Sequence, residues 1–219
     1  MKLLVLLFSI SILNIQADDG LTLVSIGKAE LSKESIKITG HTEDTISLKK
    51  KILAKKFTEL LKNDFSFYAK KFSLLDINMT SNGGLTAPIY SALKLKGVSY
   101  YFQISFKNDG SSISYNFNSY NVATQSELHN EKGSFTKSSY RKSVHLMADK
   151  IYKKITGKSK SVFTSKFIFV SDRNGTKRKP VKELFSMDFD GGNKKQLTFH
   201  GGTVISPSLS IDGNQVLYS

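Results

Sequence analysis

Residues able to do chemistry are few and scattered along this chain. It contains no cysteine, and its four histidines lie far apart without the spacing of metal ligands, at His41, His129, His145 and His200. No Gly-x-Ser-x-Gly sequence holds a nucleophilic serine in a sharp turn, and no glycine-rich loop ending in Lys-Ser or Lys-Thr binds phosphate. We therefore expect a protein that is not an enzyme, with no catalytic residue, no metal site and no cofactor.

Three aspartates in turns suggest either calcium ligands or local capping groups. They are Asp188, Asp190 and Asp212. The turn after Asp190 lacks the further oxygen ligands that a calcium loop supplies. Aspartates in tight turns commonly accept hydrogen bonds from nearby backbone N–H groups, so we favour the capping interpretation.

The charge balance is strongly basic. The chain carries 32 Lys and Arg against 18 Asp and Glu, a formal net charge of +14 over 219 residues. Such an excess is often found in proteins that bind nucleic acid. Here the lysines are spread through Ser- and Asn-rich segments, arginines are few, and arginine does not alternate with aromatic residues. We expect no nucleic-acid binding, and interpret the lysines as solvated faces that also favour anionic envelope surfaces.

The first 17 residues have the layout of a cleavable secretory signal. Lys2 gives a positive start, an apolar run covers residues 3–13, and Ala17 precedes Asp18 and Asp19. The alternative is a buried N-terminal strand or helix of a cytosolic protein. Beyond this run no apolar segment approaches the roughly 18 residues that cross a bilayer. We expect an exported chain that is not membrane-spanning.

Three segments have the pattern of helices. Residues 45–65 are amphipathic, and the polar face carries five lysines, so this helix could lie on a membrane or be an ordinary domain helix with a solvated face. A short helix over 88–96 should end at Gly97, and another should run from about Ser139 to Gly157. The apolar face of the first contains Leu48, Ile52, Leu53, Phe57, Leu60, Leu61 and Phe65.

Alternating apolar residues predict a hairpin between these helices. The alternation covers 98–106 and 113–117, and the turn at 108–111 contains Gly110 where positive φ is needed. Because the period is two, we interpret the aromatic row as the buried face of a sheet rather than a ligand platform. Further short strands are expected at 21–26, 36–39 and 131–135.

Short strands and tight turns dominate after residue 160. Strands are expected at 167–170, 184–189 and 195–198, and a hairpin at 207–218. Phe169-Val170-Ser171 is echoed by Leu217-Tyr218-Ser219 about fifty residues later, a period typical of a β-propeller blade.

The order of these motifs carries a resemblance to a known family. A strand at 166–171 is followed by the turn Asp188-Phe189-Asp190-Gly191-Gly192, then by Gln-Leu-Thr at 196–198, Ser-Pro at 206–207 and Asp-Gly at 212–213. This order resembles the blade of the TolB proteins, periplasmic components of the Tol-Pal system. Residues 90–93, 97–98, 109–110 and 148–157 resemble the N-terminal domain of the same family.

The resemblance implies a domain organisation and a fold class. It implies a signal peptide over 1–17, a TolB-like α/β domain over 18–160, and one blade with the start of a second over 161–219. The expected fold is a mixed sheet with two main helices, followed by the start of a truncated all-β propeller. In the blade turn, Leu209 and Ile211 replace the usual Trp and Pro. A single blade leaves apolar strands without a neighbour, so we expect a fragment of a longer protein; otherwise the tail packs on the first domain or on another chain.

The resemblance also implies a function based on binding. TolB-like proteins are periplasmic scaffolds that link a TolA-like inner-membrane protein to a Pal-like peptidoglycan-associated lipoprotein, supporting envelope integrity and outer-membrane constriction at division. By position, residues 18–27 match the segment that engages TolA, with Leu21, Leu23 and Ile26 as apolar anchors for strand addition. Alternatively, this strand completes the chain's own sheet. The competing functional hypothesis is a fragment of an exported peptidase gated by its propeller.

Overall fold

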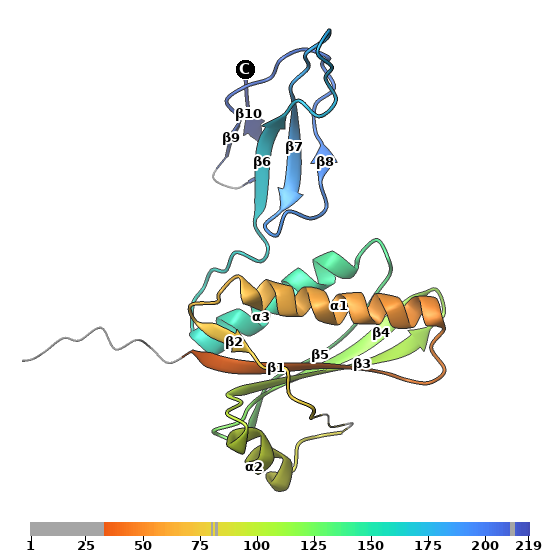
Figure 1. The fold of residues 1–219 in the computed structure, drawn as a ribbon, viewed down its shortest axis with the longest axis vertical. Coiled ribbons are helices and arrows are strands. Elements are labelled where there is room, and N and C mark those ends of the chain that lie inside the picture. Colours follow the sequence, from red (N-terminus) through yellow and green to blue (C-terminus); the bar gives the residue numbers. More distant parts are fainter. Residues whose placement is uncertain (1–32, 80, 82, 211–212) are drawn as a thin grey trace, which may run out of the picture. The chain divides into compact units, whose positions relative to one another are not determined.

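The computed structural model describes residues 33–79, 81, 83–210 and 213–219. Its first part is built on a mixed sheet of five strands, in the order β2-β1-β3-β4-β5 (Figure 1). Strand β1 runs parallel to β2 and β3, whereas β3, β4 and β5 are antiparallel. The strands are β1 (Glu34–Thr42), β2 (Phe72–Leu74), β3 (Tyr100–Asp109), β4 (Ser112–Asn121) and β5 (Ser126–Phe135). The predicted mixed sheet is confirmed.

Strands β3 and β4 form the hairpin that the alternating pattern predicts. Asp109 pairs with Ser112, so Gly110 and Ser111 make a two-residue turn. Gly110 has φ of +53°, in the left-handed region that a glycine adopts without strain. The turn residue and the side-chain alternation therefore specify the same register.

Three helices cover the two faces of this sheet. Helices α1 (Leu48–Ser66) and α3 (Tyr140–Thr156) lie on one face, and the shorter α2 (Ala87–Leu95) lies on the other (Figure 1). Helix α3 ends as predicted, because Gly157 adopts a left-handed conformation with φ of +67°. The two long helices correspond to the two main helices expected, and α2 corresponds to the short helix predicted over 88–96.

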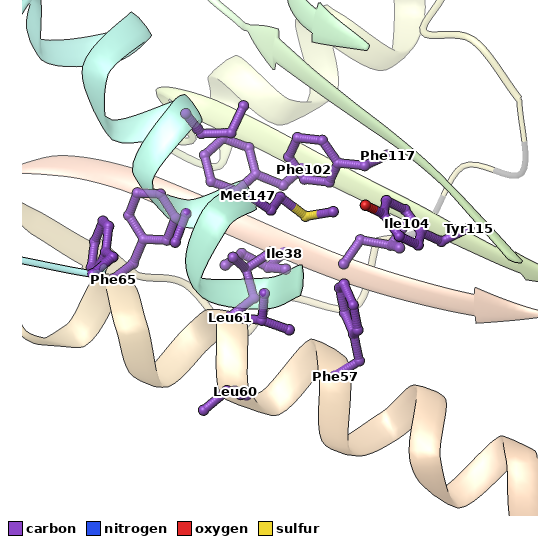
Figure 2. Packing of buried hydrophobic residues seen from close by; sticks show 14 of the residues in the cluster. Ile38, Phe57, Leu60, Leu61, Phe65, Phe102, Ile104, Tyr115, Phe117 and Met147 are labelled. Carbon is purple, nitrogen blue, oxygen red and sulfur yellow. The ribbon is translucent and has the colours of Figure 1, made fainter. Parts of the chain in front are cut away.

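The main core lies between the sheet and the two long helices. Phe57 and Leu61 of α1 and Met147 of α3 meet the inward row of β3 and β4 (Figure 2). That row contains Phe102, Ile104, Phe106, Ile113, Tyr115 and Phe117, all buried. The aromatic row is therefore the buried face of a sheet, as its period of two predicts.

A second, smaller cluster lies under α2. It consists of Tyr90, Leu93, Val98, Tyr101, Tyr120 and Val122. The sequence pattern placed Val98 in the same row as Tyr100, which is wrong. The Val98 N–H still bonds to the carbonyl of Leu93 at the end of α2, and β3 begins only at Tyr100. Val98 therefore packs with the helix on the opposite face.

The second part of the chain is entirely β-structure. Strands β6 (Lys166–Ser171), β7 (Glu183–Asp188) and β8 (Lys195–Gln196) form an antiparallel sheet, and β9 (Ser208–Leu209) pairs with β10 (Val216–Leu217). Several large apolar side chains are exposed here, namely Phe167, Leu197, Phe199, Ile205, Leu209 and Leu217. An open sheet with exposed apolar residues is compatible with one blade of a propeller, which stays a prediction.

Other expectations require correction. Leu48 and Ile52, assigned to the apolar face of α1, are exposed, because the face that meets the sheet begins at Leu53 and Ala54. Strand β2 has no counterpart in the sequence analysis. The strand expected at 21–26 lies outside the described residues. Among the residues the structure describes, no helix is long and apolar enough to cross a membrane.

Candidate functional site

Some of the candidate residues from the sequence analysis are described by the structure and others are not. Leu21, Leu23 and Ile26 lie outside the described residues, as does Asp212. His129 contacts Glu131 at 3.3 Å, and His200 contacts the Tyr218 hydroxyl at 3.1 Å. Glu131 also pairs with Lys150 at 2.6 Å. His145 belongs to a larger cluster that contains three aspartates and an arginine.

This cluster forms where helices α1 and α3 meet the turn after β7. Asp64 lies in the last turn of α1, and Arg141 and His145 lie one turn apart in α3, so that both project from the same side. Asp188 ends β7 and Asp190 follows in the turn. We call these five residues the junction cluster.

Asp64 and His145 form the buried end of the junction cluster. The Nδ1 of His145 lies 2.8 Å from Oδ2 of Asp64, so an Nδ1–H donates to the carboxylate. The Asp64 side chain has no exposed surface. Burial raises the pKa of Asp64, and the hydrogen bond from His145 offsets only part of this effect.

Arg141 and Asp190 form the outer end of the junction cluster. The Nη2 of Arg141 donates to both oxygens of Asp190, at 2.6 and 2.5 Å, and its Nε lies 3.5 Å from Oδ2 of Asp188. Burial acts to raise the pKa of Asp190, but the N–H of Gly192 and the Arg141 guanidinium outweigh it, and the pKa is lowered. The Gly192 N–H bonds to Asp190 Oδ1 at 3.0 Å, which confirms the predicted capping role of Asp190.

Two phenylalanines, Phe163 and Phe189, pack beside the charged groups of the junction cluster. Phe189 lies between Asp188 and Asp190, and its ring is 5.5 Å from that of Phe163 and 5.0 Å from that of His145. Phe163 and Phe189 are both buried and belong to the same core as α1 and α3. The turn after β7 is thus fixed to the helices by apolar packing and by ion pairs.

A cavity of about 420 Å³ opens beside the junction cluster. Arg141, His145 and Asp188 line it, together with Phe163 and Asn193. The Nε2 of His145 is buried without a hydrogen-bond partner in the described structure, and lies 3.8 Å from Oδ2 of Asp188. Among the described residues, no serine hydroxyl is hydrogen-bonded to this nitrogen.

Three residues of the junction cluster could approach a metal ion. Asp64, His145 and Asp190 each offer one ligand atom, and these atoms lie within 4.8 Å of one another. However, the Nδ1 of His145 is already hydrogen-bonded to Asp64, and Arg141 donates hydrogen bonds to both oxygens of Asp190. Since a cation would have to compete with that guanidinium, the chemistry of the site favours a structural ion-pair network.

The sequence analysis missed this cluster because 81 residues separate Asp64 from His145. One signal was present. Asp64 occupies the apolar face of α1, one turn after Leu60 and Leu61, where a carboxyl needs a polar partner. The partner could not be identified from spacing, because it lies on another helix.

The chain is similar in sequence to curated bacterial proteins. The Tol-Pal system protein TolB of Roseobacter denitrificans is 35% identical over 111 residues, which cover 50% of this chain and 25% of that protein. The TolB of Orientia tsutsugamushi is 34% identical over 112 residues, covering 51% of this chain and 24% of that protein. A TolB homolog of Chlorobium chlorochromatii is 29% identical over 171 residues, 76% of this chain and 37% of that protein. No protein-family model matches the chain.

A solved structure shares the fold. The crystal structure of TolB from Acinetobacter baumannii superposes with a TM-score of 0.65 at 19% identity, covering 85% of this chain and 43% of that one. The alignments with the first two relatives span about a quarter of the length of those proteins. The structural likeness therefore covers most of this chain but less than half of the solved TolB chain.

Proposed function

Because this chain is a member of the TolB family, we propose that it acts as a non-enzymatic, periplasmic component of the Tol-Pal system. The observation that carries the proposal is its similarity to several curated relatives named Tol-Pal system protein TolB. The expected action is binding: a TolA-like inner-membrane protein on one side and a Pal-like peptidoglycan-associated lipoprotein on the other. Such a link would support envelope integrity and outer-membrane constriction at cell division.

The junction cluster has a definite part in this proposal. A scaffold holds two partners at a defined distance only if its own parts are fixed to one another. The Arg141–Asp190 ion pair and the packing of Phe163 on Phe189 attach the turn after β7 to α3. We propose that they hold the first blade of a propeller on the α/β domain. The peptidase hypothesis has no comparable support, since the relatives are named as Tol-Pal proteins.

Removing residues 18–27 should abolish binding to the TolA-like partner. In the proposal, Leu21, Leu23 and Ile26 insert their side chains while the backbone extends a sheet of the partner. The measurement is a calorimetric titration of the partner's purified periplasmic domain into the chain that begins at Asp18, and into the deletion. Replacing only these three residues with serine should weaken binding at least tenfold.

The control for this titration is Leu95→Ser, which removes an apolar side chain that is 89% exposed on α2. This variant should bind like the unaltered chain. Circular dichroism should show that the deletion leaves the helices and the sheet folded. Equal affinity of the deletion and the unaltered chain would remove residues 18–27 from the site.

A further inference from the structure

The outward side of α1 carries apolar residues that the fold does not use. Leu48 is 73% exposed and Ile52 is 50% exposed, one turn further along the helix. The opposite side of α1 provides the buried contacts, through Phe57, Leu61 and Phe65. Leu48 and Ile52 therefore form a ridge in solvent, which we call the α1 ridge. Leaving two large aliphatic side chains in water contributes nothing to folding.

Lysines flank the α1 ridge on both sides. On one side, Lys49, Lys50, Lys56 and Lys137 line a cavity of about 460 Å³ whose apolar wall includes Ile52 and Leu53, and no acidic residue lines it. On the other side, Lys51, Lys55 and Lys62 line a hollow of about 300 Å³, where Glu59 is the one acidic residue. The positive charge is thus spread over the whole outward side of the helix.

Most of these lysines have no electrostatic partner within the part of the chain that the structure describes. Lys62 pairs with Glu59 at 2.9 Å. Among the residues the structure describes, Lys49, Lys51, Lys55 and Lys56 form neither an ion pair nor a hydrogen bond through their ammonium groups. Four like charges within eight residues repel one another, so an external negative charge would stabilise this surface.

The α1 ridge is held firmly in place. The Nζ of Lys50 donates to Oδ1 of Asn108, to the carbonyl of Gly110 and to the carbonyl of Ser112, at 2.5, 2.6 and 2.9 Å. These bonds attach the first turn of α1 to the β3–β4 turn. Binding to the ridge would therefore require little ordering of the backbone, which lowers the entropic cost of association.

We propose that the outward side of α1 docks on a membrane surface rich in anionic phospholipid. Leu48 and Ile52 would enter the boundary between headgroups and acyl chains, and the flanking lysines would lie among the phosphates, with their aliphatic stems along the apolar boundary. A protruding ridge with charge on both sides fits a planar anionic surface. An acidic peptide bound in one of the two hollows would contact the lysines on one side of the ridge only.

The test is co-sedimentation with vesicles. The protein is the chain beginning at Asp18, so that the apolar run at 3–13 is absent, and the vesicles contain phosphatidylcholine alone or with about 30% phosphatidylglycerol. Each lysine near an anionic surface contributes about fivefold in binding at low salt. We expect binding to the anionic vesicles, little binding to the neutral ones, and weakening as salt increases.

Two sets of variants locate the surface. The triple change Lys49→Gln, Lys55→Gln and Lys56→Gln should weaken binding at least tenfold. Its control is Lys177→Gln, Arg178→Gln and Lys179→Gln, which removes the same charge from the exposed loop between β6 and β7 and should change binding less than twofold. Leu48→Ser with Ile52→Ser should weaken binding about fivefold, whereas Leu95→Ser with Leu217→Ser should leave it unchanged.

Three results would overturn the proposal. The unaltered chain could fail to bind anionic vesicles at low salt. The control triple variant could lose as much binding as the α1 triple variant, which would show that overall charge alone is responsible. Finally, the chain could bind poly-L-glutamate but not the vesicles, which would assign this surface to an acidic polypeptide.

Discussion

Replacing Phe163 with alanine should lower the free energy of unfolding by about 3 to 5 kcal/mol. The side chain is 1% exposed, and its ring lies within 5.8 Å of the rings of Phe65, Tyr68, Tyr152 and Phe189. Alanine would leave a cavity bordered by two helices and the turn after β7. Because these elements are already fixed by the sheets, they cannot collapse to fill it.

The same change should also separate two unfolding transitions. Phe163 connects the core of the α/β part to Phe189, so its loss should release the strands after β6 before the helices unfold. Urea unfolding followed by far-ultraviolet and near-ultraviolet circular dichroism should show one transition for the unaltered chain and two for the variant.

The matched control is Phe167→Ala, four residues further along. That side chain is 51% exposed in β6, and its removal should cost less than about 1 kcal/mol. If Phe163→Ala cost no more than this control, the packing of Phe163 between the helices and the turn after β7 would be contradicted.

Replacing Arg141 with leucine should destabilise the protein by about 2 kcal/mol at neutral pH. The change leaves Asp190 and Asp188 without the cation that pairs with them in a largely buried setting. Removing one partner of a fully buried pair costs about 3 to 5 kcal/mol, and we reduce this figure because a quarter of the Arg141 side chain is exposed. Arg141→Lys keeps the charge but not the two-oxygen contact, so its cost should be smaller.

The effect of Arg141→Leu should depend on pH in a defined direction. The folded protein lowers the pKa of Asp190 below its ordinary value of 3.8, so the ion pair stabilises the fold above that pH. This stabilisation is lost as the pH falls through the lowered pKa. The difference in unfolding free energy between the unaltered chain and the variant should therefore shrink below about pH 4. A difference that stayed constant to pH 2 would show that the lost packing of Arg141, and not its charge, is responsible.

Gly192 offers an independent check on the same ion pair. A Cβ at this position would overlap Nη2 and Cζ of Arg141, so Gly192→Ala should displace the guanidinium and destabilise the fold. In the Arg141→Leu background the obstacle is absent, and Gly192→Ala should cost little more. Gly202→Ala, where an added Cβ meets nothing within 4 Å, is the matched control. Additive costs of Gly192→Ala and Arg141→Leu would contradict the assigned contact.

The elements that could be predicted are those specified by local patterns. The β3–β4 hairpin follows from alternation on both sides of Gly110, and the end of α3 follows from Gly157. In each case the spacing of the apolar residues and the glycine that ends the element predict the same structure, within a segment of about twenty residues. The same local consistency carries the family resemblance, which the similarity to curated TolB proteins confirms.

The elements that could not be predicted depend on distant partners. Strand β2 has three residues, and its parallel pairing with β1 leaves no alternating pattern to detect. Leu48 and Ile52 lie in the helix that the pattern predicted, but they project from the side of α1 opposite to its buried residues. The spacing of apolar residues predicts a helix, whereas the burial of each residue depends on which elements of the fold pack against that helix.

The junction cluster was beyond sequence analysis for the same reason. Asp188 and Asp190 were recognised as turn residues, yet Arg141 and Asp64 come from two different helices. Only the packing of α1 beside α3 brings these charges together. The propeller remains a prediction, since the open sheet of β6, β7 and β8 is compatible with one blade but does not demonstrate the ring.

We propose that this chain works by binding partners of the Tol-Pal system. The most direct measurement is co-purification from a cross-linked envelope extract, with the tagged chain beginning at Asp18 as bait and quantitative mass spectrometry as readout. We expect a TolA-like protein to be enriched with the bait, and this enrichment to be lost when residues 18–27 are deleted. If no Tol-Pal protein is enriched, while a tagged full-length TolB from the same extract retains its partners, the claim is contradicted.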